Sequence, residues 1–433
     1  MSSSGLETNC LRLMLPEATS PCKKPIQGIV LKRMNKKKIY LDYASTTPVD
    51  QRVFAAMRPF FFGKFGNPMS IHSFGREASE AVEKARRKAA VFFGCEAEEI
   101  IFTSGATESN NFALKGAAIA FSGHQRKVTP HIITTQFEHS CVLNSAKKLE
   151  EQGMAEVTYL TIPPDGVIHT RDVMESLKDN TILVSIMYVN NEIGTIQPIK
   201  ETGQALTKLN PERENRGLPR VLFHTDAVQA VNYLDCRVAT LGVDLLTASA
   251  HKIYGPKGVG CLFIRKNTPI KRIQDGGGHE FGLRAGTLNV PAIVGFGAAL
   301  EIAEKERMKN FNQSLKLRNY LLKKIKKEIT GVKLNGSEIK RIPNNLNLNI
   351  KDVEGEGLLL GLDLLGAAVS TGSACSSGDL RPSHVLTALG ISEEESHGSL
   401  RITLGKYTTK QDIDYFASAL KEIVGRLRKI AGK

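Results

Sequence analysis

Short apolar runs rich in branched residues alternate with helix-like segments over much of the chain. The runs lie at 100–103, 131–135, 181–189 and 220–224, and polar residues follow each of them. Stretches with helical spacing occur at 79–93 and 109–120. This alternation predicts an α/β fold with a mostly parallel, helix-covered sheet. Ligands bind beyond the carboxyl ends of strands in such sheets, so the polar residues after each run are the first candidates for chemistry.

The pattern changes near residue 300. A long lysine-rich helical segment covers 300–329, and strand-like runs follow at 345–350 and 400–404. Shorter helical segments are expected at 355–365 and 383–390. A final helix is expected to begin at Thr409, with Asp412 completing an acidic variant of a capping box. These features predict a second, smaller α+β domain.

The charge of the chain narrows the choice of partners only slightly. Its 433 residues include 58 lysines and arginines against 44 acidic residues, a net charge of +14. No zinc-finger spacing or recognition-helix motif accompanies this charge, so no direct nucleic-acid binding is expected. A solvated basic surface is the main interpretation, and an acidic protein partner or tRNA is the alternative.

Cysteine spacing and hydropathy argue against other classes of protein. The seven cysteines include no CxxC pair, which argues against a disulfide framework or a zinc site and favours a reducing, cytoplasmic compartment. No apolar run reaches the roughly 18 residues that a membrane span needs. Residues 1–33 do not resemble a secretory signal, and we expect a loosely ordered extension there. An organellar transit peptide is the alternative for this segment.

The segment 104–107 (SGAT) is a candidate anion site. It lies between a predicted strand and a predicted helix, where free N–H groups favour a phosphate. A simple helix cap at Ser104 or Thr107 is the alternative. Two glycine-rich stretches, at 255–258 and 276–278, lack the spacing of dinucleotide and P-loop sites. Binding of a dinucleotide or of a nucleotide in a P-loop therefore loses its main support in the sequence.

Lys252 and Asp226 form a candidate pair. Lys252 lies in HKIYGPKG, before a glycine-rich turn, where a partly desolvated lysine can bond covalently to a carbonyl. Asp226 follows the run at 220–224, and an aspartate facing a ring nitrogen is the expected partner of lysine-bound pyridoxal phosphate. Taken singly, Lys252 would be a surface lysine and Asp226 a helix cap.

Cys375 stands alone in a small, polar loop, 370–378 (STGSACSSG). A thiol in such a setting should be accessible, which is a condition for a nucleophilic thiolate. Cys261 and Cys95 stand close to large apolar residues, and the interpretation as inert buried cysteines suits them better.

Together these motifs resemble the cysteine desulfurases of the NifS/IscS type, in the class V aminotransferase group of pyridoxal-phosphate enzymes. The resemblance runs in order from about residue 38 to the C-terminus. The matching segments are 40–48 (YLDYASTTP), 103–110 (TSGATESN), 138–139 (EH), 189–194 (VNNEIG), 226–229 (DAVQ), 251–258 (HKIYGPKG), 276–287 (GGGHEFGLRAGT), 370–386 and 399–405 (SLRITLG). The combination is specific, although no single motif is. It implies pyridoxal-phosphate fold type I.

The resemblance implies a role for each matching residue. Pyridoxal phosphate would be bound covalently by Lys252. Its ring would contact Asp226 at the nitrogen, Gln229 at the phenolic oxygen and His139 at one face. Its phosphate would be bound by Ala106, Thr107, Ser249 and His251, with Thr287 reaching in from the second subunit of a homodimer. The substrate carboxylate would be bound by Arg401 and by Asn191, which also lies beside the cofactor. The catalytic residues would be Lys252, His139 and Cys375.

The implied activity converts L-cysteine to L-alanine and transfers sulfur to Cys375 as a persulfide. Sulfur-acceptor proteins for iron–sulfur cluster assembly or tRNA thiolation would be its partners. No resident metal is implied, and Cys375 would at most be a transient iron–sulfur ligand. Selenocysteine lyase and a noncatalytic sulfur-relay scaffold are the alternatives. The expected domains are a large cofactor-binding domain at 52–305 and a small domain, 34–51 with 306–433, that carries the cysteine loop.

Overall fold

A seven-stranded sheet, with the strand order β2-β8-β7-β6-β5-β3-β4, forms the larger of the described sheets. The computed structural model describes residues 38–122, 128–371 and 382–433. The strands are β2 (Ile100–Thr103), β3 (His131–Thr135), β4 (Glu156–Leu160), β5 (Thr181–Ser185), β6 (Leu222–Asp226), β7 (Leu245–Ser249) and β8 (Gly260–Ile264). All of them run parallel except β8, which is antiparallel to both β2 and β7. The predicted mostly parallel sheet is confirmed.

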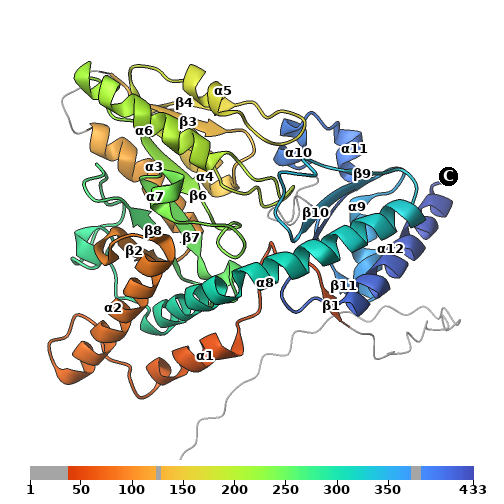
Figure 1. Cartoon of the computed structure of the whole chain (residues 1–433), viewed down its shortest axis with the longest axis horizontal. Helices are drawn as coiled ribbons and strands as arrows, with labels where there is room; N and C mark the ends of the chain where they lie inside the picture. Colours follow the sequence, from red (N-terminus) through yellow and green to blue (C-terminus); the bar gives the residue numbers. More distant parts are fainter. Residues whose placement is uncertain (1–37, 123–127, 372–381) are drawn as a thin grey trace, which may run out of the picture. The chain divides into compact units, whose positions relative to one another are not determined.

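Burial on both faces explains why most of these strands read as continuous apolar runs. Every residue of β2, β3, β5, β6, β7 and β8 is buried. Alternate residues face two different cores, so that Ile132 belongs to one apolar cluster and its neighbour Ile133 to the other. Helices lie along both faces of the sheet (Figure 1). The edge strand β4 is only partly buried, and the sequence pattern gave no signal for it.

The helices around this sheet begin at caps that the apolar pattern does not show. Their bounds are α1 (Gln51–Met57), α2 (Ser73–Phe93), α3 (Ala106–Ser122), α4 (Ser140–Glu151), α5 (Thr170–Glu175), α6 (Ile199–Asn215) and α7 (Val238–Leu241), with 3-10 turns η1 (Arg58–Phe61), η2 (Ala97–Glu99), η3 (Ala250–Lys252) and η4 (Glu280–Gly282). The helix predicted at 79–93 begins six residues earlier, because the His72 ring accepts a hydrogen bond from the Gly75 amide and caps α2 there.

Antiparallel strands and helices follow in the C-terminal part, as predicted for an α+β unit. A three-stranded sheet has the order β12-β10-β9, and β1 pairs with β11. The elements are β1 (Ile39–Tyr40), α8 (Val290–Glu328), β9 (Val332–Leu334), β10 (Asn345–Ile350), α9 (Gly355–Leu364), β11 (Ala367–Ala368), α10 (His384–Ala388), α11 (Glu393–His397), β12 (Ser399–Thr403) and α12 (Lys410–Ile430). Thr409 and Asp412 form the predicted capping box of α12.

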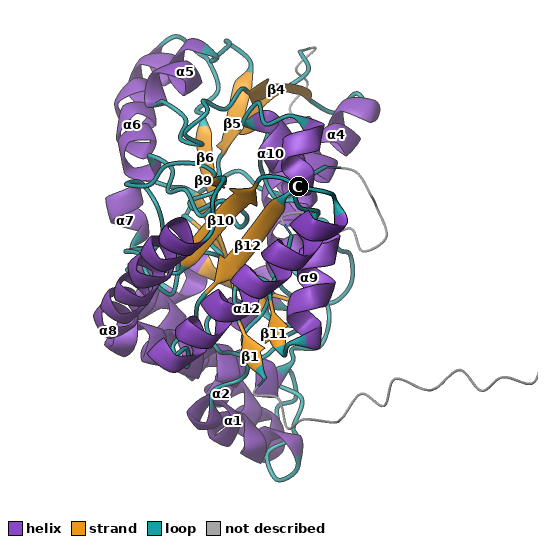
Figure 2. Ribbon diagram, turned by 90° about the vertical axis from the view of Figure 1, so that its right-hand side faces the viewer, coloured by secondary structure: helices purple, strands orange, loops and turns teal. Residues whose placement is uncertain are grey.

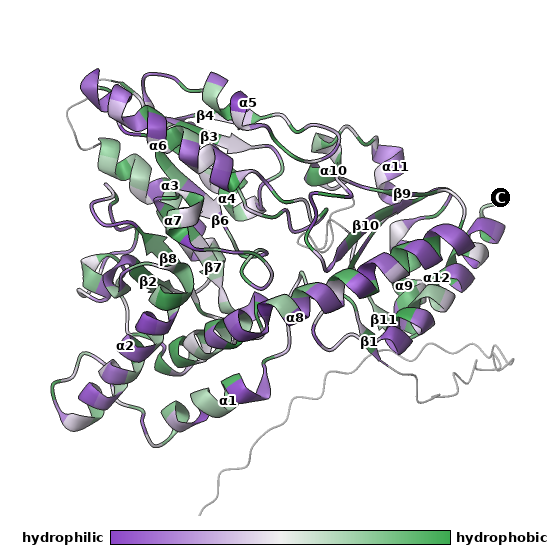
Figure 3. Cartoon of the chain, viewed as in Figure 1, coloured by the Kyte–Doolittle hydropathy of each residue, from purple (hydrophilic) through white to green (hydrophobic). Residues whose placement is uncertain are grey.

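The long helix α8 runs from the large sheet to the smaller one and passes the predicted domain boundary at 305 without a break (Figure 1). Helices α9 and α12 pack on one side of β10 and β12 around a third apolar cluster (Figure 2). Figure 3 shows hydrophobic residues along the central strands and hydrophilic ones along much of α8 and α12. Across the described ranges, no helix is both long enough and apolar enough to cross a membrane. The exact domain boundaries stay a prediction.

A buried ion pair fixes the glycine-rich segment 276–287 to α2. Both terminal guanidinium nitrogens of Arg86 donate to the Glu280 carboxylate, at 2.8 and 2.7 Å, and the Phe102 amide donates to it at 2.6 Å. The side chains of Arg86 and Glu280 are 3% and 0% exposed. Glu280 and Phe281 have left-handed backbones, with φ of 46° and 57°, a conformation that side chains disfavour. The ion pair therefore holds a strained turn in place.

Replacing Arg86 with methionine should destabilise the protein by about 3–5 kcal/mol, because the Glu280 carboxylate would stay buried without its counter-ion. Chemical unfolding measures this loss. The matched control is Arg87→Met, one residue along α2 and exposed, which should change stability by less than about 0.5 kcal/mol. Adding Glu280→Gln to Arg86→Met should recover part of the loss. Equal effects at the two arginines would contradict the prediction.

Candidate active site

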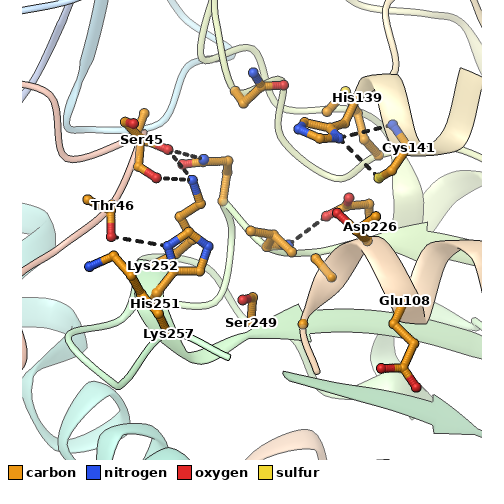
Figure 4. Close-up of a pocket in the computed structure, with 18 of the residues that line it drawn as sticks. Ser45, Thr46, Glu108, His139, Cys141, Asp226, Ser249, His251, Lys252 and Lys257 are labelled. Atoms are coloured by element: carbon orange, nitrogen blue, oxygen red, sulfur yellow. Dashed lines mark hydrogen bonds between the residues drawn. The ribbon is translucent and has the colours of Figure 1, made fainter. Parts of the chain in front are cut away.

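A cavity of about 570 Å³ opens at the carboxyl ends of the parallel strands. Residues that follow β2, β3, β5, β6 and β7 line it, together with residues 44–46 and one residue of β12 (Figure 4). The predicted site residues among its lining are Ala106, Thr107, His139, Asn191, Asp226, Gln229, Ser249, His251, Lys252 and Arg401. The fold therefore brings Ala106 and Arg401, which are 295 positions apart in the sequence, into one site.

Two predicted site residues stand apart from this group. Thr287 is exposed and is not among the residues that line the cavity. Cys375 lies outside the described residues. Cys261, expected to be inert, is fully buried in β8, and Cys95 is half-buried.

The segment 44–46 forms one wall of the cavity and contacts three predicted site residues. The Lys252 Nζ donates to the carbonyl oxygens of Ala44 and Ser45, both at 2.6 Å. The Gln229 amide also donates to the Ala44 carbonyl, at 2.9 Å. This segment belongs to the matched motif YLDYASTTP, but the motif predicts no role for it, because its contribution comes from backbone carbonyls that any residue carries.

Asp226 ends β6 inside the cavity, and its carboxylate accepts two hydrogen bonds. The Asn110 Nδ2 donates to its Oδ2 at 2.6 Å, and the Val228 amide donates to its Oδ1 at 3.0 Å. A turn rather than a helix follows, so Asp226 is not a helix cap. The two donors fix the carboxylate at the cavity wall, where it can face a ring nitrogen that carries a proton.

The turn from β2 into α3 offers an anion site, and the start of β8 lies against this turn. Glycine is required on its β8 side, because a Cβ at Gly260 would lie 2.6 Å from the Ala248 oxygen and 2.9 Å from the Gly105 Cα. The first N–H groups of α3 have no partners within the helix and point toward its N-terminal end, where Ala106 and Thr107 line the cavity. Ser249 and His251 reach the same cavity from the end of β7.

Charges around this anion site are balanced by pairing and burial. Burial alone would raise the pKa of Glu108, but hydrogen bonds from Arg284, at 2.8 Å, and from the Ser104 amide, at 2.7 Å, lower it. Burial lowers the pKa of His251 to about 4, and the charges of Lys252 and Lys257 add to this effect. His251 is therefore neutral at pH 7, and its Nδ1 is hydrogen-bonded to the Thr46 hydroxyl at 3.1 Å.

Arg401 enters the cavity from β12, and both terminal nitrogens of its guanidinium are hydrogen-bonded to other residues. One terminal nitrogen donates to the Asn191 carbonyl at 3.1 Å, and the other donates to the Asp42 carboxylate at 2.9 Å. Its side chain is 3% exposed, and its Nε has no hydrogen-bond partner among the described residues. The remaining N–H groups of the guanidinium suit a carboxylate, which binds two donors at once.

Cys141 and Asn110 are functional candidates that sequence analysis missed. Cys141 lines the cavity two residues after His139, and Asn110 lies one turn into α3 with no exposed surface. The sequence contains one weak signal for each residue. Asn110 is the last residue of the matched segment TSGATESN, and Cys141 lies two residues after the matched segment EH. Burial raises the pKa of the Cys141 thiol to about 12, and the Asp226 charge adds to this, so the group is a thiol rather than a thiolate.

The residues present fit a group that carries a phosphate, a protonated ring nitrogen and a carbonyl. The phosphate matches the helix start with Ser249 and His251, the ring nitrogen matches Asp226, and the carbonyl matches the amine of Lys252. Among the described residues, no cluster of three or more histidine, cysteine, aspartate or glutamate side chains has the arrangement of a metal site.

Comparison with known proteins places this arrangement in a family. The model of the aminotransferase class-V family matches residues 39–416. The chain belongs to the class V aminotransferases. Within the family, it is 50% identical over 396 residues to a cysteine desulfurase IscS of Dictyoglomus turgidum, covering 92% of this chain and 97% of that protein. It is 48% identical over 398 residues to a mitosomal cysteine desulfurase of Encephalitozoon cuniculi, covering 91% and 88%.

Solved structures of related proteins share the fold. A NifS-like protein superposes with a TM-score of 0.82 and 38% identity, covering 90% of this chain and 100% of that one. A structure described as SspA in complex with cysteine has a TM-score of 0.73 and 36% identity, covering 86% and 100%. The class V fold that the sequence motifs predict is thus confirmed.

The buried Glu138, next to His139, gives the fold a pH dependence. Its Oε1 accepts from the Thr135 hydroxyl and the Met187 amide, both at 2.9 Å, while its Oε2 has no partner among the described residues. Burial raises its pKa to about 8. The pKa of Glu138 in the folded chain lies above its ordinary value of 4.5. Its contribution to the free energy of unfolding is therefore fully present below about pH 4.5 and is lost as the pH rises through about 8.

Glu138→Gln should remove this pH dependence, because glutamine keeps the acceptor oxygen and cannot ionise. The stability of the variant relative to the native chain should increase by roughly 3 kcal/mol between pH 5.5 and pH 8.5. Urea unfolding at the two pH values measures this difference. The exposed Glu98→Gln serves as the control and should show no such change. Parallel stability profiles for native chain and Glu138→Gln would mean that Glu138 ionises freely in the folded protein.

Proposed function

We propose that this chain is a pyridoxal-phosphate-dependent cysteine desulfurase, which converts L-cysteine to L-alanine and transfers the sulfur to Cys375 as a persulfide. The observation that carries the proposal is the meeting of Lys252, Asp226, His139 and Arg401 around one cavity. Relatives with 44–50% identity that bear the name cysteine desulfurase support the choice of substrate. The related protein whose solved structure is a complex with cysteine supports it as well.

The cofactor, when bound, supplies an electron sink for negative charge that develops at the substrate α-carbon. The Asp226 carboxylate would face the protonated ring nitrogen and stabilise that charge state. The Lys252 Nζ would hold the cofactor, and its free amine would be the base that accepts the proton from the α-carbon. Arg401 binds the substrate carboxylate and orients this C–H bond. His139 would cover one face of the ring.

Sulfur transfer requires a separate nucleophile. The Cys375 thiolate attacks the substrate sulfur, and an S–S bond forms as the bond between that sulfur and the β-carbon breaks. The electron pair of the broken bond goes to carbon, which takes up a proton and becomes the methyl group of alanine. The persulfide then passes to an acceptor protein of iron–sulfur cluster assembly or tRNA thiolation.

Mixing the purified holoprotein with L-cysteine tests this function. The holoprotein should absorb at roughly 400–420 nm, as lysine-bound pyridoxal phosphate does. A stoichiometric amount of alanine should appear, and mass spectrometry should find one added sulfur atom on Cys375. Alanine release from selenocysteine but not from cysteine would instead indicate a selenocysteine lyase. Absence of both the absorption and alanine would indicate a noncatalytic relay protein.

We also propose that the active form is a homodimer. Large apolar side chains are unusually exposed between α1 and the start of α2, where a second copy could cover them. They are Phe54, Phe61, Phe62, Phe65, Met69, Ile71 and Phe74, which are 51–90% exposed. Exposed apolar area of this kind is typical of protein interfaces. Thr287 lies outside the cavity of its own chain, which supports the idea that it reaches the cofactor of the other subunit.

Thr287→Ala should weaken cofactor binding about ten- to hundredfold, because one hydroxyl donor to a charged phosphate contributes about 1.5–3 kcal/mol. Titration of the apoprotein with pyridoxal phosphate measures the affinity, and Thr287→Ser is the control that keeps the hydroxyl. In mixed dimers with Lys252→Ala, the intact Thr287 of the second subunit should restore tight binding at the site that retains Lys252. If demonstrated subunit exchange brings no recovery, Thr287 acts within its own chain.

A reducing, cytoplasmic compartment is the proposed location. The described cysteines Cys95, Cys141, Cys236 and Cys261 are free thiols, which supports a reducing environment. The mitosomal relative offers an organellar alternative. Fractionation of the native cell, followed by detection of the chain, decides between the two locations.

A further inference from the structure

Four side chains form a hydrogen-bonded chain along one side of the cavity. The Asn110 Nδ2 donates to the Asp226 Oδ2 at 2.6 Å and to the Cys141 Sγ at 3.1 Å. The Cys141 Sγ lies 3.0 Å from the His139 Nδ1, and the Cys141 amide donates to the same nitrogen at 3.2 Å. Figure 4 shows His139 and Cys141 together at the start of α4, with Asp226 next to them. These hydrogen bonds thus link Asp226, the proposed partner of the cofactor ring nitrogen, to His139, which is proposed to cover one face of that ring.

The hydrogen bonds that Asn110 makes have a fixed direction, whereas the direction of the one between Cys141 and His139 follows from the tautomer of the imidazole. The Asp226 carboxylate already accepts from the Val228 amide, and a carboxylate can only accept, so the Asn110 NH2 group must face it. One N–H of that group then points to Asp226 and the other to the Cys141 sulfur. The sulfur accepts there, so its single hydrogen is free to be donated to the His139 Nδ1.

The backbone supports the same direction at the end of the chain. The Cys141 amide can only donate, so its 3.2 Å contact with the His139 Nδ1 also favours an Nδ1 that accepts and carries no hydrogen. A neutral imidazole has one N–H group, which lies at Nε2 when Nδ1 accepts from both the thiol and the amide of Cys141. The ring nitrogen away from Cys141 is on the cavity side in Figure 4. The proton of His139 is thus held at the atom that faces the cavity.

We propose that Asn110 and Cys141 are positioning residues that hold His139 as the neutral tautomer with its proton on Nε2 and tie that tautomer to the Asp226 carboxylate. The proposal rests on the proposed function, because it refines how the same cavity acts on its cofactor and substrate. It assigns Cys141 a role in orientation and not in sulfur transfer.

The charges around His139 agree with a neutral ring. Burial lowers the pKa of His139, and the charges of Lys252, on η3, and His384, on α10, lower it further, while Asp226, at the end of β6, acts against them. Glu138, which precedes the ring on the chain, is protonated at pH 7 because burial raises its pKa to about 8. The neutral state leaves the choice of tautomer to the hydrogen bonds described above.

The physical consequence is a fixed proton donor at the cavity wall. With the opposite tautomer, Nε2 would become an acceptor and Nδ1 would meet the amide hydrogen of Cys141 head-on. A ring that alternates between tautomers would present the wrong group to the reacting atoms for part of the time. Loss of the Cys141 thiol leaves the weaker, 3.2 Å amide contact as the restraint on the ring nitrogen.

Nitrogen NMR of protein labelled with 15N-histidine tests the tautomer directly. The chain has 10 histidines, and the His139 signals are identified as those that disappear in His139→Asn. In the holoprotein we expect one neutral form, with a non-protonated Nδ1 and a protonated Nε2. In Cys141→Ala we expect averaged signals from both tautomers. In Cys141→Ser, whose hydroxyl accepts and donates in the same directions, the native pattern should return.

Turnover provides the second measurement. Cys141→Ala should lower kcat about five- to twentyfold, the effect of one lost hydrogen bond, while KM for cysteine changes by less than about twofold. Cys141→Ser should recover most of this loss. Asn110→Ala should also lower kcat, because the Asp226 carboxylate loses a donor. Cys95→Ala, a half-buried cysteine outside the cavity, should behave as the native enzyme.

The proposal and the proposed function can fail separately, because the NMR measurement also works on the apoprotein. An unchanged His139 tautomer in Cys141→Ala overturns the proposal, and so does a Cys141→Ser variant that behaves as Cys141→Ala. A persulfide found on Cys141 after reaction with cysteine would also overturn it, because the residue would then be a sulfur acceptor. A holoprotein that produces no alanine overturns the proposed function and leaves the tautomer result intact.

Discussion

Lys252→Ala should abolish alanine production from cysteine and remove the absorption at roughly 400–420 nm. Lysine is the residue whose amine can both hold the cofactor and act as the base at the α-carbon. Loss of a positioned acid or base alone lowers the rate about 10²–10⁴-fold, and loss of the covalent attachment adds to this. Alanine formation measured by amino-acid analysis, with pyridoxal phosphate in excess, gives the residual rate.

The matched control for this variant is Lys266→Ala, an exposed lysine just beyond β8 and outside the cavity. It should keep full activity and absorption. Partial rescue of Lys252→Ala by a small primary amine would show that the amine itself, and not a folding defect, was lost. Full alanine production by Lys252→Ala without added amine would refute the assignment.

Cys375→Ser should separate sulfur transfer from the chemistry at the cavity. The variant should bind pyridoxal phosphate and respond spectrally to cysteine as the native chain does, because Cys375 is not among the residues proposed to hold the cofactor. It should form no persulfide and release almost no sulfide, since a serine hydroxyl is a far weaker nucleophile than a thiolate. Spectral titration and mass spectrometry of the protein after reaction measure the two properties.

Cys95→Ser and Cys261→Ser are the controls, because the first lies outside the cavity and the second is fully buried in β8. Burial raises the pKa of Cys261 to a value above that of a reactive thiol, so it is not expected to carry sulfur. A persulfide that persists in Cys375→Ser, on any other cysteine, would assign the acceptor role elsewhere.

Local patterns were sufficient to predict the fold class and the place of the site. Fully buried parallel strands leave uninterrupted apolar runs, so β2 and β3 were predicted with their observed bounds. The polar residues that follow such runs gather at one edge of the sheet because the strands are parallel. For this reason Thr107, which follows β2 at the start of α3, and Asp226, which ends β6, could be placed in one site from the sequence.

The roles of the individual residues came from the combination of motifs and not from any pattern at a single position. Lys252 is one of many lysines, and its own surroundings in the sequence fit a surface residue equally well. Only the ordered match to the motifs of a family predicts a role for it. Whether Thr287 acts across a dimer stays a prediction, because one chain cannot show it.

The tertiary structure alone decided the contacts that hold the site in shape. Arg401 is oriented by Asp42, which is 359 residues away in the sequence, and Lys252 is held by the Ala44 and Ser45 carbonyls. Arg86 and Glu280 form their buried pair across 194 residues. No local pattern encodes such pairs, because each partner alone has the composition of an ordinary polar position.

The hydrogen bonds around His139 show most clearly which features the sequence determines and which the tertiary structure determines. The sequence placed a histidine after a strand, and a cysteine two residues further along was given no role. Which imidazole nitrogen carries the proton depends on Asn110, which arrives from α3, and on Asp226, which arrives from β6. The sequence by itself determined the elements and the edge where they end. The three-dimensional packing of those elements decided which donors and acceptors meet, because hydrogen bonds depend on distances of about 3 Å that only the folded chain sets.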